Sequence, residues 1–194
     1  MKRVIVITGT PGVGKTEVSK VLAEKLNAEY LNLTEVAKKG NFIIEFDRER
    51  DTFVVDSKKL RSFIVDFISS HKSWVVVDSH YAYDVVPIDY VFMVFVLRCN
   101  PYKLKKRLMK RGYSGKKLYE NVQAEILDVC LYESINAYGE KLICEIDVSD
   151  KNVREIVDEI ISVISGKKKP QIGVVDWLGL LESQEKLNEF FSHY

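Results

Sequence analysis

Short apolar runs alternate along the chain with longer stretches in which apolar residues recur every three or four positions. The runs are rich in β-branched residues and predict strands over residues 4–7, 30–33, 74–77, 91–97 and 142–146. The periodic stretches predict helices over residues 15–26, 60–68, 104–109, 118–138 and 153–164. Because strands and helices alternate, the pattern predicts an α/β fold with a five-stranded parallel sheet and helices on both faces.

Two segments depart from this alternation. Residues 42–46 and 52–55 flank a charged stretch, which predicts a small hairpin or excursion. Three lysines and Pro170 end the pattern, so residues 1–165 are expected to form the core and residues 166–194 an appendage. Apolar positions between 174 and 191 recur at helical spacing and predict an amphipathic helix. We expect this helix to dock on its own core; the alternative is a helix that binds a partner.

Composition restricts the class of protein. The 194 residues suit one domain, and 46% hydrophobic with 29% charged residues is an ordinary globular profile. A net charge of +1 argues against polyanion binding by the molecule as a whole. Three cysteines without disulfide or zinc spacing favour a reducing compartment. The longest apolar run is too short for a membrane helix, and the amino-terminal run has no cleavage site, so a cytoplasmic protein with no membrane partner is expected.

A glycine-rich segment directly follows the first predicted strand. Residues 9–16 (GTPGVGKT) match the pattern G-x-x-x-x-G-K-S/T between a strand and a helix, and we call them the phosphate loop. Glycines let successive N–H groups surround a polyphosphate, and the helix that begins near Lys15 adds its dipole. Lys15 is expected to reach the β- and γ-phosphates, while the Thr16 hydroxyl suits Mg²⁺. The residues expected to bind ATP here are Gly9, Gly12, Val13, Gly14, Lys15, Thr16 and Glu17.

An acidic residue at the end of a neighbouring strand would complete a nucleotide site. Asp78 follows the apolar run 74–77 and is expected to hold Mg²⁺ through water, opposite Thr16. His80 follows two residues later, where it is a candidate to position water or an acceptor phosphate. Taken alone, it would be interpreted as a loop histidine without a role.

Residues 98–117 contain nine lysines and arginines and no acidic residue. Such like charges repel one another unless an anion is near. Phosphoryl transfer needs positioned cations, so an arginine on a mobile flap is expected, with Arg111 the first candidate and Arg107 and Arg98 behind it. The competing interpretation is an RNA-binding surface.

Together these segments resemble the adenylate kinase isoenzyme 6 family, the archaeal and eukaryotic nucleoside monophosphate kinases linked to maturation of the small ribosomal subunit. The Asp-x-His after the third predicted strand and the Arg-Gly-Tyr at 111–113 are more specific to this family than the phosphate loop, which many NTPases share. The resemblance covers about residues 1–165 and is carried by residues 9–16, 30–37, 77–80, 94–98 and 111–126.

The resemblance implies a P-loop kinase fold of three layers around a five-stranded parallel sheet, with a segment for the nucleoside monophosphate at about residues 32–52 and a short lid at about 110–120. It implies that ATP with Mg²⁺ is the phosphoryl donor, that AMP or another nucleoside monophosphate is the acceptor, and that the protein has ATPase activity. It also implies ribosomal protein uS11 and pre-rRNA as partners. The implied roles are catalysis by Lys15, Asp78, His80 and Arg111, ATP contacts from Arg107 and Arg111, acceptor contacts from Asn32, Thr34 and His80, and Mg²⁺ contacts from Thr16 and, through water, Asp78.

Several alternatives stay open at this point. Asn32 could instead cap the helix that follows it. The acceptor segment has no obvious phosphate-clamping arginine, and Arg48, Arg50 and Arg61 are loose candidates. The competing functions are an ATP-driven assembly factor and a P-loop kinase for another small metabolite. The sequence distinguishes neither the preferred acceptor nor the oligomeric state.

Overall fold

The computed structural model describes residues 2–47 and 52–192. Its main sheet has five strands in the order β2-β5-β1-β6-β7, and every neighbouring pair is parallel, which confirms the expected fold class. The strands are β1 (Val4–Thr8), β2 (Glu29–Asn32), β5 (Val75–Asp78), β6 (Val91–Arg98) and β7 (Ile143–Asp147). Each of the three central strands is an almost continuous apolar run because both of its faces are covered.

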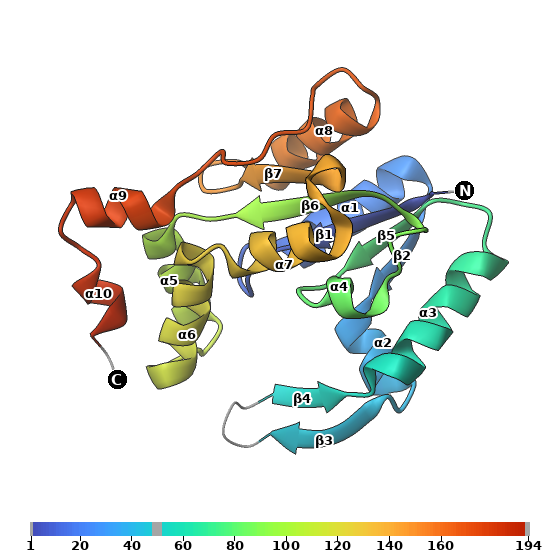
Figure 1. Ribbon diagram of the computed structural model, residues 1–194, viewed down its shortest axis with the longest axis horizontal. Helices are drawn as coiled ribbons and strands as arrows, with labels where there is room; N and C mark the ends of the chain where they lie inside the picture. Colours follow the sequence, from blue (N-terminus) through green and yellow to red (C-terminus); the bar gives the residue numbers. More distant parts are fainter. Residues whose placement is uncertain (1, 48–51, 193–194) are drawn as a thin grey trace.

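Helices cover the two faces of the sheet and make the outer layers (Figure 1). On one face, α1 (Lys15–Leu26) and α8 (Val153–Ile164) pack over Ile5 and Ile7. On the other face, α3 (Ser57–Ser70), α4 (Ala82–Val85) and α7 (Val129–Tyr138) pack over Val4 and Val6. Alternate residues of β1 therefore enter different halves of the core, as the period of a strand requires.

The predicted excursion leaves the sheet after β2. It consists of α2 (Leu33–Lys39) and an antiparallel hairpin of β3 (Ile43–Asp47) and β4 (Thr52–Val55), and α3 leads back to the sheet. The hairpin projects from the body of the molecule below the sheet (Figure 1). Residues 48–51, which include Arg48 and Arg50, lie outside the described residues.

The prediction of one long helix over residues 118–138 is wrong, because the chain forms two helices there. They are α6 (Gly115–Ile126) and α7, and they are separated at Leu127 and Asp128. Asp128 has a left-handed backbone (φ 56°), and its carboxylate pairs with the guanidinium of Arg98. That guanidinium also donates to the carbonyl oxygen of Glu125 at 2.9 Å. A buried cation at the helix end therefore favours the break, which apolar periodicity does not reveal.

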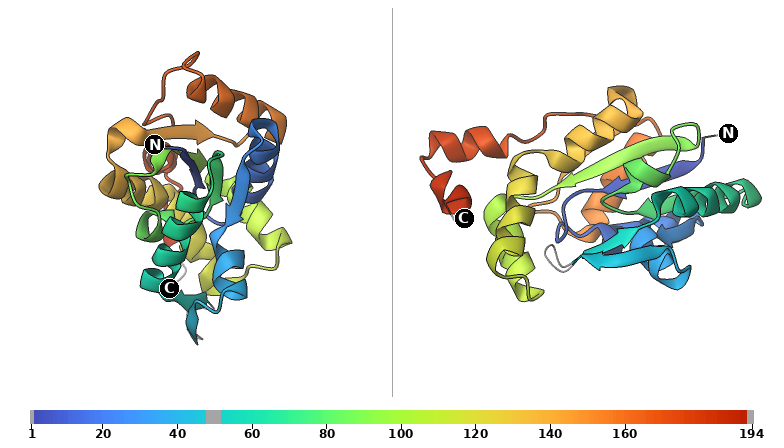
Figure 2. Two further views of the ribbon diagram at one scale, coloured as in Figure 1. Left: turned by 90° about the vertical axis from the view of Figure 1, so that its right-hand side faces the viewer. Right: turned by 60° about the horizontal axis from the view of Figure 1, so that its bottom comes forward.

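The carboxyl-terminal segment forms two short helices, α9 (Trp177–Ser183) and α10 (Asn188–Phe191), beside α5 (Pro101–Lys110) and α6 (Figure 2). Trp177, Leu181 and Phe190 are buried in the same core half as α1 and α8. The amide of Gln123 on α6 donates to the carbonyl oxygen of Phe190 at 2.6 Å. The segment thus docks on its own core, in two helices rather than one.

In the part of the chain that the structure describes, no helix has the length and apolar character needed to span a bilayer.

Candidate active site

Three parallel strands end together at one edge of the sheet. Ile7 of β1 and Asn32 of β2 are both register partners of Asp78, the last residue of β5. Because the carboxyl ends of parallel strands meet at one edge, segments far apart in sequence come together there. This places the phosphate loop, Asp78 and the start of the excursion side by side.

The phosphate loop takes a conformation that glycine favours. Gly12 and Gly14 have φ of 93° and 108°, and a Cβ on Gly9 would lie 2.4 Å from the carbonyl oxygen of Leu97. Gly14 precedes α1 and has no side chain to cap it, so the first N–H groups of the helix are available to an anion.

Lys15 turns back over this loop. Its ammonium donates to the carbonyl oxygens of Gly9 at 2.7 Å and Thr10 at 3.1 Å. Desolvation lowers the pKa of Lys15, and the nearby carboxylates of Asp78 and Glu125 oppose that shift. A cation held by neutral carbonyl groups is well placed to meet a phosphate.

The carboxylate of Asp78 gathers three side chains. It is 2% exposed, and its Oδ2 accepts hydrogen bonds from Thr16 Oγ1 at 2.7 Å, Asn32 Nδ2 at 2.8 Å and Tyr30 OH at 3.1 Å. Sequence reasoning missed Tyr30. Its position within a strand that ends beside Asp78 was the only available signal.

Two further properties of this group follow from its contacts. Desolvation raises the pKa of Tyr30 to about 12, so its hydroxyl stays a donor at neutral pH. Asn32 has the capping role considered above, because its Oδ1 accepts from the N–H of Glu35 at 3.0 Å at the start of α2. Its Nδ2 also contacts Asp78. The oxygens of Thr16 and Asp78 are hard donors of the kind that Mg²⁺ prefers, so the donor chemistry here fits that ion.

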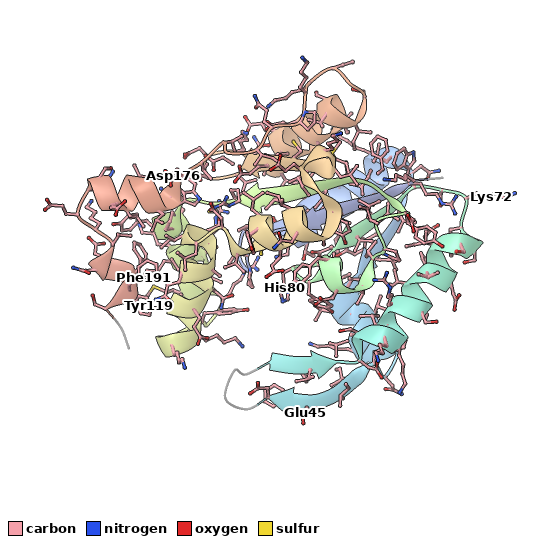
Figure 3. The ribbon with its side chains drawn as sticks, viewed as in Figure 1. Glu45, Lys72, His80, Tyr119, Asp176 and Phe191 are labelled. Atoms are coloured by element: carbon pink, nitrogen blue, oxygen red, sulfur yellow. The ribbon has the colours of Figure 1, made fainter. Side chains whose placement is uncertain are left out.

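His80 lies beside α4 in the middle of the molecule (Figure 3). The residue is exposed, and its ring meets the ring of Tyr81 in an edge-to-face arrangement, with centroids 5.0 Å apart. Desolvation by the surrounding protein and the positive charge of Lys15 lower the pKa of His80 to about 4, against the weaker effect of Asp78. His80 is therefore neutral at physiological pH.

Three adjoining hollows form one cleft at this edge of the sheet. The central hollow has about 640 Å³ and contains the phosphate loop, Asp78 and His80; the loop hollow has about 500 Å³, and the hairpin hollow about 280 Å³. The central and loop hollows share Gly12, Gly14, Glu17 and Arg111, and the central and hairpin hollows share Thr34 and His80. Such volumes are close to those of small-molecule sites, about 300–1,000 Å³.

The loop hollow includes residues that sequence reasoning missed. They come from the turn between β7 and α8, which is a strand end at the same edge of the sheet. Asn152 caps α8 there in a capping box with Glu155. The residues from this turn and helix are Val148, Lys151, Asn152, Val153 and Ile156, and they face Arg107, Lys110 and Arg111.

The hairpin hollow has mixed walls. Its apolar part comes from the hairpin and from α2, and its polar part includes Tyr81 and Asp84 of the segment after β5. Apolar walls with a few polar groups are typical of small-molecule sites. The lining residues are Thr34, Ala37, Lys38, Ile43, Phe53, Val55, Ser57, His80, Tyr81 and Asp84.

The candidate arginines separate into different environments. Arg111, at the end of α5, lines both the central and the loop hollow, and Arg107 donates to the carbonyl oxygen of Val13 at 3.3 Å. The assignment of Arg98 as a phosphate-binding candidate is wrong: it is 1% exposed and pairs with Glu125, Asp128 and Glu145.

The remaining acceptor-side candidate, Arg61, lies exposed on α3 and donates to the carbonyl oxygen of Asp84 at 3.5 Å. Acidic side chains from outside residues 98–117 compensate part of the positive charge of that segment. Lys103 pairs with Asp150, and Lys116 pairs with Glu120.

Residues 5–128 match the protein family described as AAA domain. The chain is 47% identical over 173 residues to a protein of Methanocaldococcus jannaschii described as "putative adenylate kinase", covering 89% of this chain and 92% of that one. A Saccharolobus islandicus protein with the same description is 34% identical over 194 residues, covering 98% and 97%.

Solved structures share the fold. A shikimate kinase from Acinetobacter baumannii in complex with shikimate has a TM-score of 0.60 at 16% identity, covering 87% of this chain and 96% of that one. A gluconokinase from Sinorhizobium meliloti has a TM-score of 0.55 at 18% identity, covering 86% and 95%. The strand order, the phosphate loop and these sequence similarities together show that the chain belongs to the adenylate kinase-like family of P-loop proteins.

Proposed function

We propose that this protein is a nucleoside monophosphate kinase that transfers the γ-phosphoryl group of ATP to AMP or a related nucleotide. The observation that carries the proposal is the three-part cleft, in which the central hollow with the phosphate loop joins the loop hollow on one side and the hairpin hollow on the other. A nucleoside monophosphate kinase needs a donor site and an acceptor site that meet at the transferred group, whereas an ATPase needs only the donor site. The relatives described as "putative adenylate kinase" support the same conclusion.

The donor nucleotide occupies the loop hollow and the phosphate loop in this proposal. The backbone amides of the phosphate loop and the beginning of α1 bind the polyphosphate, and Lys15 neutralises its terminal groups. The base lies between Arg107 and Arg111 on one side and the turn around Asn152 on the other. Arg111 also lines the central hollow, where it stabilises the negative charge of the transferred group.

The acceptor occupies the hairpin hollow, with its base against Phe53 and Ile43 and its phosphate toward His80 and Thr34. His80, neutral at pH 7, offers a ring nitrogen as a hydrogen-bond donor or acceptor without adding charge. Asn32 contributes by orienting Asp78 and α2. Closing α2 and the hairpin over the acceptor would exclude water, which otherwise competes for the phosphoryl group.

Thr16 and Asp78 are the residues that would hold Mg²⁺, Asp78 through bound water. The ion would supply charge neutralisation on the phosphates. Tyr30 and Asn32 hold the Asp78 carboxylate in place through their hydrogen bonds to its Oδ2.

The first experiment separates phosphoryl transfer from hydrolysis. The protein is incubated with Mg·ATP alone and then with AMP, CMP, GMP or UMP, and the nucleotide products are resolved. We expect ADP from ATP and AMP, well above the rate of phosphate release from ATP alone. Phosphate release that no nucleoside monophosphate accelerates would contradict the kinase assignment.

A second activity of the same site is ATP hydrolysis coupled to assembly of the small ribosomal subunit. The observation that favours hydrolysis is His80, exposed at the centre of the cleft two residues after Asp78, where it can orient a water molecule. The assignment of ribosomal protein uS11 or pre-rRNA as the partner rests on the family resemblance. It is tested by adding each of them to the assay with ATP alone. A rise in phosphate release with the partner, and none with AMP, would favour this function over the kinase.

A further inference from the structure

A group of buried charges lies behind the phosphate loop and outside all three hollows. Arg98 at the end of β6, Glu125 on α6 and Glu145 on β7 are 1%, 2% and 3% exposed. The guanidinium donates from Nε to Glu125 Oε1 at 2.9 Å, and its two terminal nitrogens pair with Glu145 and Asp128. Burying charges is costly unless they are paired and hydrogen-bonded, so every contact in this group affects where its members lie.

The carboxylate of Glu125 links two loops at the carboxyl edge of the sheet. Its Oε1 also accepts from the backbone N–H of Cys99 at 2.9 Å, in the loop after β6. Its Oε2 accepts from Thr10 Oγ1 at 2.6 Å. Thr10 is the second residue of the phosphate loop, and it is buried.

The far end of the group reaches the carboxyl-terminal segment. Glu145 uses its other oxygen, Oε2, to accept from the backbone N–H groups of Gly173 at 2.7 Å and Val174 at 2.9 Å. Arg98 therefore joins two carboxylates: one fixes the beginning of the docked segment, and the other fixes the phosphate loop.

We propose that Glu125 is a positioning residue of the ATP site, which holds the phosphate loop in its nucleotide-binding conformation through the hydroxyl of Thr10. This proposal rests on one part of the function proposed above, namely that the phosphate loop binds ATP. A loop that must curl its N–H groups inward loses conformational freedom when it binds an anion, and an anchor already present before binding reduces that loss. Arg98 and the N–H of Cys99 orient the Glu125 carboxylate so that Oε2 remains directed at Thr10.

The test uses Thr10→Val as the main variant, because it removes the hydroxyl and keeps the β-branched shape. The dissociation constant of ATP is measured directly, without an acceptor, by calorimetry. We expect it to rise at least about tenfold, as for a lost hydrogen bond to a charged group. KM for AMP should stay within about twofold and the melting temperature within a few degrees, and Thr10→Ser should restore most of the affinity.

A double-mutant cycle identifies Glu125 as the partner. Glu125→Gln should weaken ATP binding, and adding it to Thr10→Val should weaken binding little further, because Thr10→Val has already removed the contact through which Glu125 acts on the phosphate loop. Glu120→Gln, an exposed residue on the same helix, is the matched control and should bind ATP as the wild type does.

Three results would overturn the inference: unchanged ATP affinity in Thr10→Val, equal losses in Thr10→Ser and Thr10→Val, or losses from Thr10→Val and Glu125→Gln that multiply. Failure of the proposed function has a different signature, since wild-type protein that binds ATP but phosphorylates no acceptor contradicts the kinase alone. Wild-type protein that does not bind ATP contradicts both.

Discussion

At the scale of single residues, the site depends on how each charge is compensated. Asp78 accepts three hydrogen bonds on one oxygen, whereas Lys15 is held by backbone carbonyl oxygens of its own loop. A carboxylate with three donors is fixed in place, and an ammonium on neutral acceptors retains its attraction for an anion. Asp78 and Lys15 thus differ electrostatically, because Asp78 is already compensated by its donors whereas Lys15 is directed at the ligand.

Replacing Lys15 tests the ligand-directed role. Lys15→Ala should lower kcat by at least about 100-fold, because a positioned cation that neutralises transition-state charge contributes on that scale. The melting temperature should stay within a few degrees, since desolvation already lowers the pKa of this ammonium and its removal relieves that cost. Lys25→Ala, on the same helix and paired with Asp158 on the surface, is the control. Comparable turnover in the two variants would refute the role of Lys15.

The pKa of His80 predicts a pH dependence of stability. Its folded value of about 4 lies below the ordinary value of 6.5, so the unfolded chain binds the proton first as pH falls. The contribution of neutral His80 to stability is therefore complete above about pH 6.5 and is lost between 6.5 and 4. Melting temperatures across this window should fall more steeply for the wild type than for His80→Asn. An NMR titration that placed the His80 pKa above 6 would contradict this.

At the scale of elements, the phosphate loop is supported from behind by the helix that carries the candidate arginines. A Cβ on Gly12 would lie 2.9 Å from Leu108 and 3.0 Å from Leu104, both on α5, whereas a Cβ on Gly14 meets nothing within 4 Å. The loop and α5 are thus packed in contact at Gly12. The helix that packs against the loop at Gly12 therefore also carries Arg107 and is capped by Arg111.

This difference predicts unequal effects of two similar substitutions. Gly12→Ala and Gly14→Ala both place a side chain at positive φ, which costs about 1–2 kcal/mol each. Gly12→Ala should lose about 1–3 kcal/mol more in the free energy of unfolding, because its methyl group overlaps the leucines of α5. Urea unfolding without nucleotide measures the difference. Equal losses would show that the loop and α5 are not tightly packed.

At the scale of the whole molecule, the carboxyl-terminal segment belongs to the core of the nucleotide-binding domain. Its helices α9 and α10 lie beside α5 and α6, and Figure 3 shows Phe191 and Tyr119 on their neighbouring sides. Lys105 of α5 lies over the ring of Phe190 at 5.6 Å and over that of Tyr119 at 4.6 Å. The segment therefore supports the two helices that flank the Arg-Gly-Tyr turn.

Two adjacent leucines of α9 test this docking. Leu181 is 1% exposed and Leu180 is 38% exposed. Leu181→Ala should lower the free energy of unfolding by about 2–5 kcal/mol, as for other buried leucines. Leu180→Ala should change it by about 0.5 kcal/mol or less. Thermal and urea unfolding provide the measurement, and equally mild effects would mean that the segment is undocked in solution.

The sequence by itself determined the sheet, the phosphate loop and the position of Asp78. Each of these follows from neighbours along the chain: apolar runs make buried strands, glycine spacing sets the loop, and the residue after a strand lies at the edge of the sheet. Helices such as α3 and α5 differ from the prediction by a few residues at their boundaries, whereas the helix predicted over 118–138 is divided into α6 and α7.

The tertiary structure alone decided which charges face the cleft and which are buried. Arg98 belongs to the same basic run as Arg107 and Arg111, but its partners Glu125 and Glu145 lie 27 and 47 residues away. The tertiary structure also decided that the turn around Asn152 lines the cleft, because β7 lies beside β6 in the sheet. Local periodicity records whether a residue is buried, but the partner of a charge is set by which strands are neighbours, and that is a property of the whole fold.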